Sequence, residues 1–122
     1  MENLVNWFEI PVVDFDRART FYSAITEVPI ETVNLMGMTM GMFTPADEPA
    51  GGAIVKSDFH KPSTDGIVVY LNGNPDLNIM LNKVADAGGL IVMHKTQIAA
   101  DLGFMAFFID SEGNKIALHS KS

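Results

Sequence analysis

The sequence contains no cysteine among its 122 residues. A disulfide framework, a thiolate nucleophile and a metal site built on thiolates are therefore excluded. Hydrophobic residues make up 48% of the chain and charged residues 19%, a balance that argues against disorder. The length fits one domain that is large enough to bury a core.

Positive charge is scarce as well. Eight Lys and Arg stand against 15 Asp and Glu, which gives a formal net charge of -7 and a pI near 4.7. Such a field repels phosphate backbones, so nucleic acid is not expected as a partner. No apolar run approaches the roughly 20 residues that cross a bilayer, so no membrane contact is expected. Residues 1–5 lack the basic and apolar regions of a secretory signal, and we expect a cytoplasmic protein.

The stretch from Trp7 to Tyr22 predicts a strand that runs directly into an amphipathic helix. Aromatic and branched side chains favour a strand over residues 7–13. Asp14 or Asp16 can cap the helix that follows, because a short side-chain acceptor satisfies free amide donors of the first turn. Apolar residues then recur at helical spacing, namely Ala18, Phe21, Tyr22 and Ile25.

Proline and glycine divide the rest of the chain. Val28-Pro29 ends the first helix, and Gly88-Gly89 ends a second helix over about 77–85. Loops are predicted at 44–52 and 96–102, and a polar linker at 56–66. Further strands are predicted at 30–35, 38–43, 53–55, 67–71, 90–93, 104–109 and 115–119, and an extension of the strand at 90–93 to residue 95 is left open.

The two halves repeat one order of elements. Each reads strand, helix, strand, strand, strand, with a period of about 60 residues. We therefore predict an α+β fold in a single domain spanning residues 1–122. It consists of two βαβββ modules, at about 4–56 and about 66–120, whose strands form a curled mixed sheet.

This repeated order resembles the vicinal oxygen chelate superfamily, which contains glyoxalases, extradiol dioxygenases, epimerases and bleomycin resistance proteins. Residues 11–22, Pro-Val-Val-Asp-Phe-Asp-Arg-Ala-Arg-Thr-Phe-Tyr, are similar to the family's opening strand and helix. Residues 107–118, Phe-Phe-Ile-Asp-Ser-Glu-Gly-Asn-Lys-Ile-Ala-Leu, are similar to its closing hairpin, with an acidic-Gly-Asn turn. With Gly88-Gly89 included, the resemblance covers nearly the whole chain.

The resemblance implies a cup that holds a ligand or a metal on its concave face. Metal-dependent members take His and Glu ligands from the first and last strands of each module. Matched to the family, these positions fall at Trp7, near Gly66, within 53–55 and at Ala117. None of these residues ligates a divalent metal. We therefore predict no metal ligand and no cofactor, and a bound divalent metal is disfavoured.

Strand parity selects the candidate site residues, because residues of one parity share a face. If the family's ligand face is the cup interior, then Glu9, Tyr70 and His119 point toward it with Trp7. Glu9 and His119 are the candidate catalytic residues, since a carboxylate and an imidazole can serve as acid and base. The candidate substrate-binding residues are Trp7, Tyr70, Phe43 and Met40.

Each candidate also has a structural interpretation. Glu9 can pair with a neighbour such as His119 as a structural hydrogen bond, and His119 can simply be exposed. Tyr70 can belong to the core, as can the alternating methionines Met36, Met38, Met40 and Met42. His60 and His94 are expected to be solvated.

The predicted function is the binding of a small, partly apolar molecule in a metal-free cup. One alternative is a metal-dependent glyoxalase- or dioxygenase-like enzyme whose ligands have moved to Glu9 and His119. Others are a drug-sequestering binding protein, or a structural or regulatory dimer whose cup its own side chains fill. A homodimer is expected, because many family members with one module pair per chain are dimers and the apolar content here is high.

Overall fold

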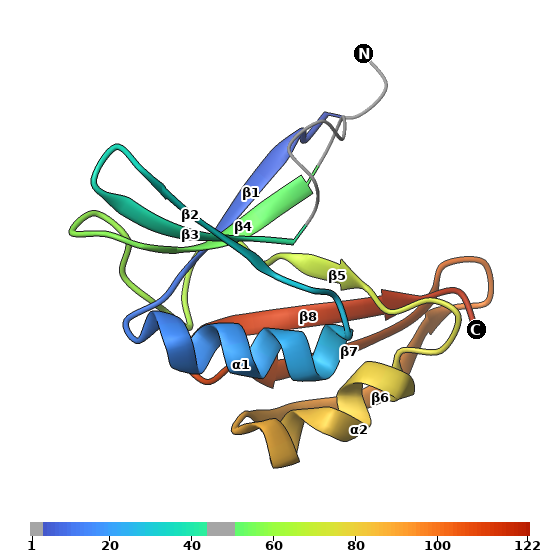
Figure 1. The fold of residues 1–122 in the computed structure, drawn as a ribbon. Coiled ribbons are helices and arrows are strands. Elements are labelled where there is room, and N and C mark those ends of the chain that lie inside the picture. Colours follow the sequence, from blue (N-terminus) through green and yellow to red (C-terminus); the bar gives the residue numbers. More distant parts are fainter. Residues whose placement is uncertain (1–3, 44–50) are drawn as a thin grey trace.

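The structure, a computed structural model, describes residues 4–43 and 51–122 (Figure 1). Its helices are α1 (Phe15–Thr26) and α2 (Asn78–Ala87). Its strands are β1 (Trp7–Pro11), β2 (Glu31–Leu35), β3 (Met38–Met42), β4 (Gly51–Lys56), β5 (Tyr70–Asn72), β6 (Leu90–Ala99), β7 (Gly103–Ile109) and β8 (Lys115–Ser120). Neither helix of the described ranges has the length and apolar character needed to span a membrane.

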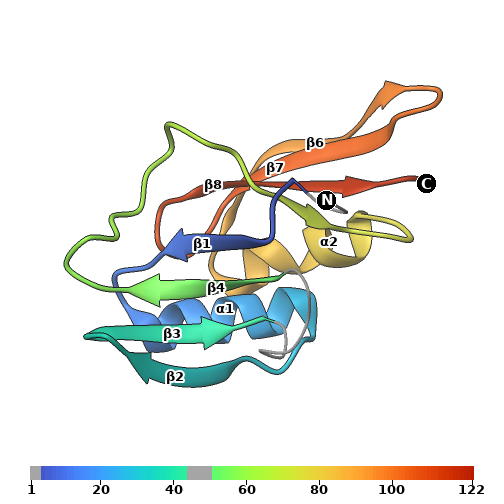
Figure 2. The same cartoon turned by 90° about the horizontal axis from the view of Figure 1, so that it is seen from above.

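Two four-stranded sheets share one topology. The first has the order β1-β4-β3-β2, and the second has the order β5-β8-β7-β6. In each sheet the first strand is parallel to the last strand of its module, and the other pairs are antiparallel. This arrangement confirms the predicted α+β fold built from two βαβββ units. The described strands form two sheets with no hydrogen-bonded strand pair between them. The edge strand β1 of the first sheet lies next to β5 and β8 of the second sheet (Figure 2).

The start of α1 and the ends of both helices lie where the capping residues and the proline of the sequence predicted them. Asp14 is the N-cap of α1, and its carboxylate accepts a hydrogen bond from the Arg17 N–H at 3.0 Å. The helix ends at Glu27, which adopts the left-handed conformation with φ 59°. Gly88, with φ 110°, ends α2 and donates its N–H to the Val84 and Ala85 carbonyls. Glycine adopts this conformation without the clash that a Cβ would cause.

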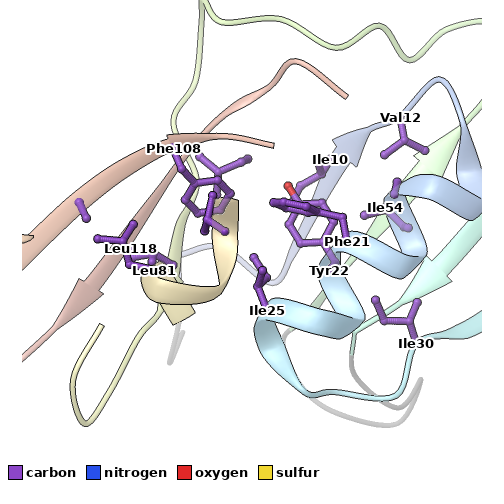
Figure 3. Packing of buried hydrophobic residues seen from close by; sticks show 14 of the residues in the cluster. Ile10, Val12, Phe21, Tyr22, Ile25, Ile30, Ile54, Leu81, Phe108 and Leu118 are labelled. Carbon is purple, nitrogen blue, oxygen red and sulfur yellow. The ribbon is translucent and has the colours of Figure 1, made fainter. Parts of the chain in front are cut away.

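One hydrophobic core joins both helices to one face of each sheet (Figure 3). The Phe21 ring packs edge-on against Tyr22 at 5.0 Å and lies 6.0 Å from the Phe108 ring of β7. Residues from both modules fill this core, including Ile10, Ile25, Ile54, Leu77, Leu81, Val84, Ile116 and Leu118. Because the buried cluster spans both units, each module depends on the other for burial of its apolar face.

Several predicted boundaries are wrong. β5 covers 70–72 only, although the Val69 carbonyl still accepts a hydrogen bond from the Ala117 N–H at 3.0 Å. β6 continues to Ala99, so residues 96–99 are not irregular. Register shifts along the pairing of β6 with β7 let this strand continue through a polar sequence that has no regular alternation.

Two glycines assigned to a loop belong to a strand. Gly51 and Gly52 open β4, and a Cβ at Gly52 would overlap the Phe8 ring of β1. The glycine therefore makes room for an aromatic side chain in the core. Residues 44–50 of the predicted loop lie outside the described part of the chain. Met36 lies in the β2–β3 turn with φ 54°, so it does not share the strand face of Met38 to Met42.

A polar turn between β7 and β8, residues 110–114, joins the two modules, and we call it the closing turn. Asp110 is 4% exposed and accepts hydrogen bonds from the Tyr22 hydroxyl at 2.5 Å and from the Glu112 and Asn114 N–H groups, both at 2.9 Å. The Asn114 side chain donates to the Pro11 carbonyl of β1 at 2.7 Å. Burial, and next the Asp110 carboxylate, raise the pKa of Tyr22 well above its usual value, so its hydroxyl remains a donor.

Glu112 of the closing turn accepts hydrogen bonds from the residues at the start of α1. Its carboxylate accepts hydrogen bonds from the Val13 and Asp14 N–H groups at 2.9 and 2.7 Å. The Arg17 guanidinium donates to both oxygens, at 2.7 and 3.1 Å, and the Glu112 side chain is fully covered. Burial raises the pKa of Glu112, but the hydrogen bonds from Arg17, Asp14 and Val13 outweigh it and hold the pKa below its ordinary value.

Replacement of Asp110 by alanine should strongly destabilise the fold. The buried Tyr22 hydroxyl and the Asn114 amide would lose their acceptor, and we expect the free energy of unfolding to fall by about 3 kcal/mol. Urea denaturation measures this change. Asp101→Ala, at an exposed position of the β6–β7 turn, serves as the control and should stay within about 0.5 kcal/mol of wild type. Equal effects of the two variants would contradict this account of the closing turn.

The Glu112 carboxylate should contribute to acid sensitivity. Because its folded-state pKa is depressed, its stabilisation is present above the unfolded value near 4.5 and is lost as the pH falls through the lower folded value. Glu112→Gln should cost about 2 kcal/mol at neutral pH and show a shallower loss of stability below pH 4.5. Melting temperatures recorded across this range test the effect. Parallel acid profiles for the two proteins would refute it.

Candidate functional site

The candidate site lies where the first strands of the two modules face each other (Figure 2). Side chains alternate along β1, so Phe8 and Ile10 pack toward the core. Trp7 and Glu9 point the other way, and Trp7 is 37% exposed. On the far side of the gap Tyr70 is 50% exposed. The structure therefore brings three residues predicted from parity to one place.

A cavity of about 590 Å³ opens between these strands. It is lined by Val5, Trp7, Phe8, Glu9, Ile67, Val68, Val69 and Tyr70. A smaller cavity of about 160 Å³ shares Glu9, Ile67 and Val69 with it and adds Lys61, Ser63, Asp65 and Lys115 among its walls. We call the two together the cleft. Its larger part is apolar and aromatic around the single carboxylate of Glu9, and its smaller part is charged.

Glu9 is held by two donors. Its Oε1 lies 2.8 Å from His60 Nε2, and its Oε2 accepts a hydrogen bond from Trp7 Nε1 at 3.2 Å. The Nδ1 of His60 lies 2.6 Å from Ser57 Oγ. The expectation that His60 is solvated is therefore wrong, and so is the pairing of Glu9 with His119. The cause is the linker, which runs from β4 past the end of β1 (Figure 2). The contact with Glu9 places His60 of this linker beside the strand.

His119 lies on the same face of the second sheet as Tyr70 but away from the cleft. It stands opposite Asn72 of β5 and Met105 of β7, and its Nε2 is 2.7 Å from the Leu102 carbonyl. It lines a separate cavity with residues 100–102 of the β6–β7 turn, Gly103 of β7 and Lys121. The structure does not bring the two candidate catalytic residues, Glu9 and His119, together.

The ring of Tyr70 packs against a second aromatic ring. Its ring packs at 63° against the Phe107 ring of β7, with 6.0 Å between the centroids. The register of β5 and β8 places it opposite Ala117, whose small side chain leaves the tyrosine ring uncovered on that side. Tyr70 thus presents an open aromatic face to the cleft instead of filling the core.

Met40 and Phe43 lie on opposite faces of the first sheet. Met40 is 7% exposed and packs with Ala53 and Val55 on the same side of the sheet as Glu9. Phe43 has the other parity, and its ring stacks 6.0 Å from Phe8 and lies 5.5 Å from Tyr22. Phe43 therefore packs against the core, and the structure does not bring it to Trp7.

The positions that hold a metal in the related enzymes do not fit one here. Trp7 uses its indole N–H as a donor to Glu9, and Gly66 has no side chain. Ala53, Val55 and Ala117 are buried aliphatic residues. Across residues 4–43 and 51–122, no group of three or more His, Asp or Glu side chains is arranged to hold a metal ion.

His60 and Ser57 are the site residues that sequence reasoning missed. Both lie in the polar linker, where neither periodicity nor a spacing motif fixes which strand they approach. A weak signal was present, because Glu9 faces a partly apolar cup and a carboxylate there needs donors. Of the three histidines, strand parity favoured His119 as the partner, because no local rule places the linker that carries His60.

No protein-family model matches the sequence, and no curated protein matches it. Solved structures do match its fold. A glyoxalase/bleomycin resistance protein from Albidiferax ferrireducens superposes with a TM-score of 0.68 at 15% identity, over 98% of this chain and 100% of that one. An antibiotic binding protein from a Streptomyces species gives 0.66 at 19% identity, over 98% and 97%.

A glyoxalase/bleomycin resistance protein/dioxygenase family enzyme from Burkholderia phytofirmans gives a TM-score of 0.69 at 10% identity, over 96% of this chain and 98% of that one. Identities this low establish the fold and leave the activity open. The likeness spans both modules of the chain. The chain thus has the glyoxalase/bleomycin resistance fold of the vicinal oxygen chelate superfamily, as its opening and closing motifs indicated.

Proposed function

We propose that this protein binds a small, partly apolar molecule in the cleft and does so without a metal. One observation carries the proposal: Trp7 and Tyr70 are 37% and 50% exposed, and both line one concave, largely apolar cavity. Exposed aromatic side chains that converge on a cavity with few polar groups are typical of small-molecule sites. A buried core would have covered them.

The dimensions of the cleft agree with this function. Its larger cavity, about 590 Å³, lies within the roughly 300–1,000 Å³ of ordinary ligand pockets. A ligand that covers the two aromatic faces gains roughly 25 cal/mol for each Å² of apolar surface removed from water. The fixed carboxylate of Glu9 provides a polar group to orient the ligand.

Metal-free binding is proposed because side chains at the family's ligand positions have no donor for a metal. Chelation of vicinal oxygens needs a Lewis acid held by several converging ligands. Trp7 and Ala117, which occupy two of those positions, supply none. The antibiotic binding protein of the same fold supports a second candidate within this proposal, the sequestration of a drug-like molecule without turnover.

A homodimer remains part of the proposal. Large apolar side chains are exposed near the cleft and on the linker, namely Leu4, Val5, Phe59 and Ile67. A second copy would cover such surface. Native mass spectrometry should therefore give twice the chain mass of 13.3 kDa. A protein that stays at the single-chain mass at micromolar concentration would rule this assembly out.

The neutral fluorescent probe N-phenyl-1-naphthylamine tests binding. We expect saturable binding to one site per chain that is unchanged by EDTA. Trp7→Ala and Tyr70→Ala should each weaken binding by about tenfold, since each removes an aromatic face that the probe covers. Fluorescence titration measures the dissociation constants.

Ile79→Ala is the matched control, because Ile79 is a half-exposed apolar residue of α2 outside the cleft. Its dissociation constant should equal that of wild type. Probe binding that does not saturate, or that EDTA abolishes, would overturn the proposed function. If Trp7→Ala, Tyr70→Ala and Ile79→Ala weaken binding equally, the probe binds outside the cleft. That result would also overturn the proposed function.

A further inference from the structure

The larger cavity carries one charged group, and that group is fixed in place. Of its eight lining residues only Glu9 bears a charge. Among residues 4–43 and 51–122, each carboxylate oxygen of Glu9 has one protein donor, Trp7 Nε1 at 3.2 Å and His60 Nε2 at 2.8 Å. A carboxylate oxygen accepts more than one hydrogen bond, so both oxygens keep acceptor capacity. The side chain remains 33% exposed, which leaves that capacity accessible.

The hydrogen-bond pattern assigns a role to His60. Ser57 Oγ accepts the Phe59 N–H at 3.0 Å and lies 2.6 Å from His60 Nδ1, so Ser57 anchors the far side of the imidazole ring. A carboxylate only accepts hydrogen bonds, so the hydrogen between His60 and Glu9 lies on Nε2. Ser57 and His60 therefore hold the carboxylate of Glu9 in one orientation.

Aromatic side chains lie on both walls of the cavity that holds this charge. Trp7 is bonded to Glu9 and lines the same cavity, and Tyr70 lies on the opposite wall. The face of an aromatic ring attracts a cation, most strongly for tryptophan. A carboxylate in a cavity that two aromatic side chains line is a site for a positively charged nitrogen attached to an apolar body.

We infer that the cleft selects organic cations, such as an amine on an aromatic or aliphatic body, and that His60 is a positioning residue for Glu9. This inference rests on the proposed function and names the ligand class of the same cleft. Glu9 supplies the countercharge, Trp7 and Tyr70 cover the apolar body, and His60 with Ser57 holds the carboxylate toward the ligand.

The other charged groups of the cleft lie in its smaller part. Lys61 and Lys115 are balanced in number by Glu9 and Asp65 among its walls. The Lys115 ammonium lies 5.9 Å from the centre of the Phe107 ring. The net charge of -7 over the whole chain favours the approach of cations over anions. An anionic ligand would have to rely on these two lysines, and this gives the alternative that the experiment must separate.

A charge series on one ring tests the inference. Benzylamine, benzyl alcohol and benzoate present the same ring with a positive, a neutral and a negative group near neutral pH. Trp7 is the only tryptophan, so its fluorescence reports binding in the cleft directly. We expect benzylamine to bind about tenfold or more tightly than benzyl alcohol, with benzoate weakest, because a charge-assisted hydrogen bond is roughly twice as strong as a neutral one.

Three variants separate the charge from its positioning. Glu9→Gln should bind benzylamine and benzyl alcohol equally. His60→Leu should lose part of the preference, whereas His60→Gln, which keeps an N–H donor, should retain more of it. Asp86→Asn removes one exposed carboxylate of α2 and should keep the full preference, which controls for net charge. Melting temperatures establish that the variants are folded.

The outcomes distinguish the inference from the proposed function. Equal affinity for benzylamine and benzyl alcohol in wild type overturns the inference while binding in the cleft stands. Tighter binding of benzoate also overturns it and assigns recognition to the lysines. If N-phenyl-1-naphthylamine binds and benzylamine does not, the ligand class is wrong. If neither binds, the proposed function fails as well. A preference that Asp86→Asn reduces as much as Glu9→Gln does would refute the role of Glu9.

Discussion

The arrangement of the molecule depends on the hydrogen bonds that the closing turn makes to the first module. Asp110 receives the Tyr22 hydroxyl of α1, and Asn114 donates to the Pro11 carbonyl of β1. Glu112 accepts the first amides of the corner before α1 together with the Arg17 guanidinium. These contacts join residues about 90 to 100 positions apart in the chain. They fix the end of β1 relative to β8 and so define one wall of the cleft.

This turn also explains why the opening and closing motifs occur together. Each supplies groups that only the other satisfies. The amides of Val13 and Asp14 precede α1 and have no intrahelical acceptor, and Glu112 provides one. Buried Asp110 would carry an uncompensated charge without its ring of donors. The motif residues are thus determined by mutual satisfaction of buried polar groups, and the larger cavity of the cleft lies outside the two motifs.

The separation of the larger cavity from the two motifs explains which features the sequence could predict. The two modules, the Asp14 cap and the face shared by Trp7 and Glu9 follow from local periodicity, capping and parity, and the structure confirms them. Phe43 was assigned to the cup, but its parity is opposite to that of Met40, and its ring packs with Phe8. The partner of Glu9 depends on the path of the linker, which no local rule fixes. The length of β6 depends on register shifts against β7 that its composition does not reveal.

The linker fixes the orientation of the Glu9 carboxylate in the cleft, which the two sheets alone would not do. A carboxylate at Glu9 without donors would rotate freely in a partly apolar cavity, and a ligand would have to pay for its ordering. With His60 Nε2 on one oxygen and Trp7 Nε1 on the other, that cost is met during folding. Ser57, in turn, holds His60 Nδ1 at 2.6 Å and accepts the Phe59 N–H, which fixes the ring beside Glu9.

Preorganisation of this kind increases discrimination more than it increases overall affinity, because the fixed carboxylate rewards a donor and penalises an anion at the same place. The apolar walls would accept many molecules of suitable size, and the charge restricts them. By the resemblance, metal-dependent proteins of this fold take their ligands from the first and last strands of each module. Here the equivalent position on β1 holds an indole, and the residue two positions further along the strand carries the charge that the proposed ligand would match.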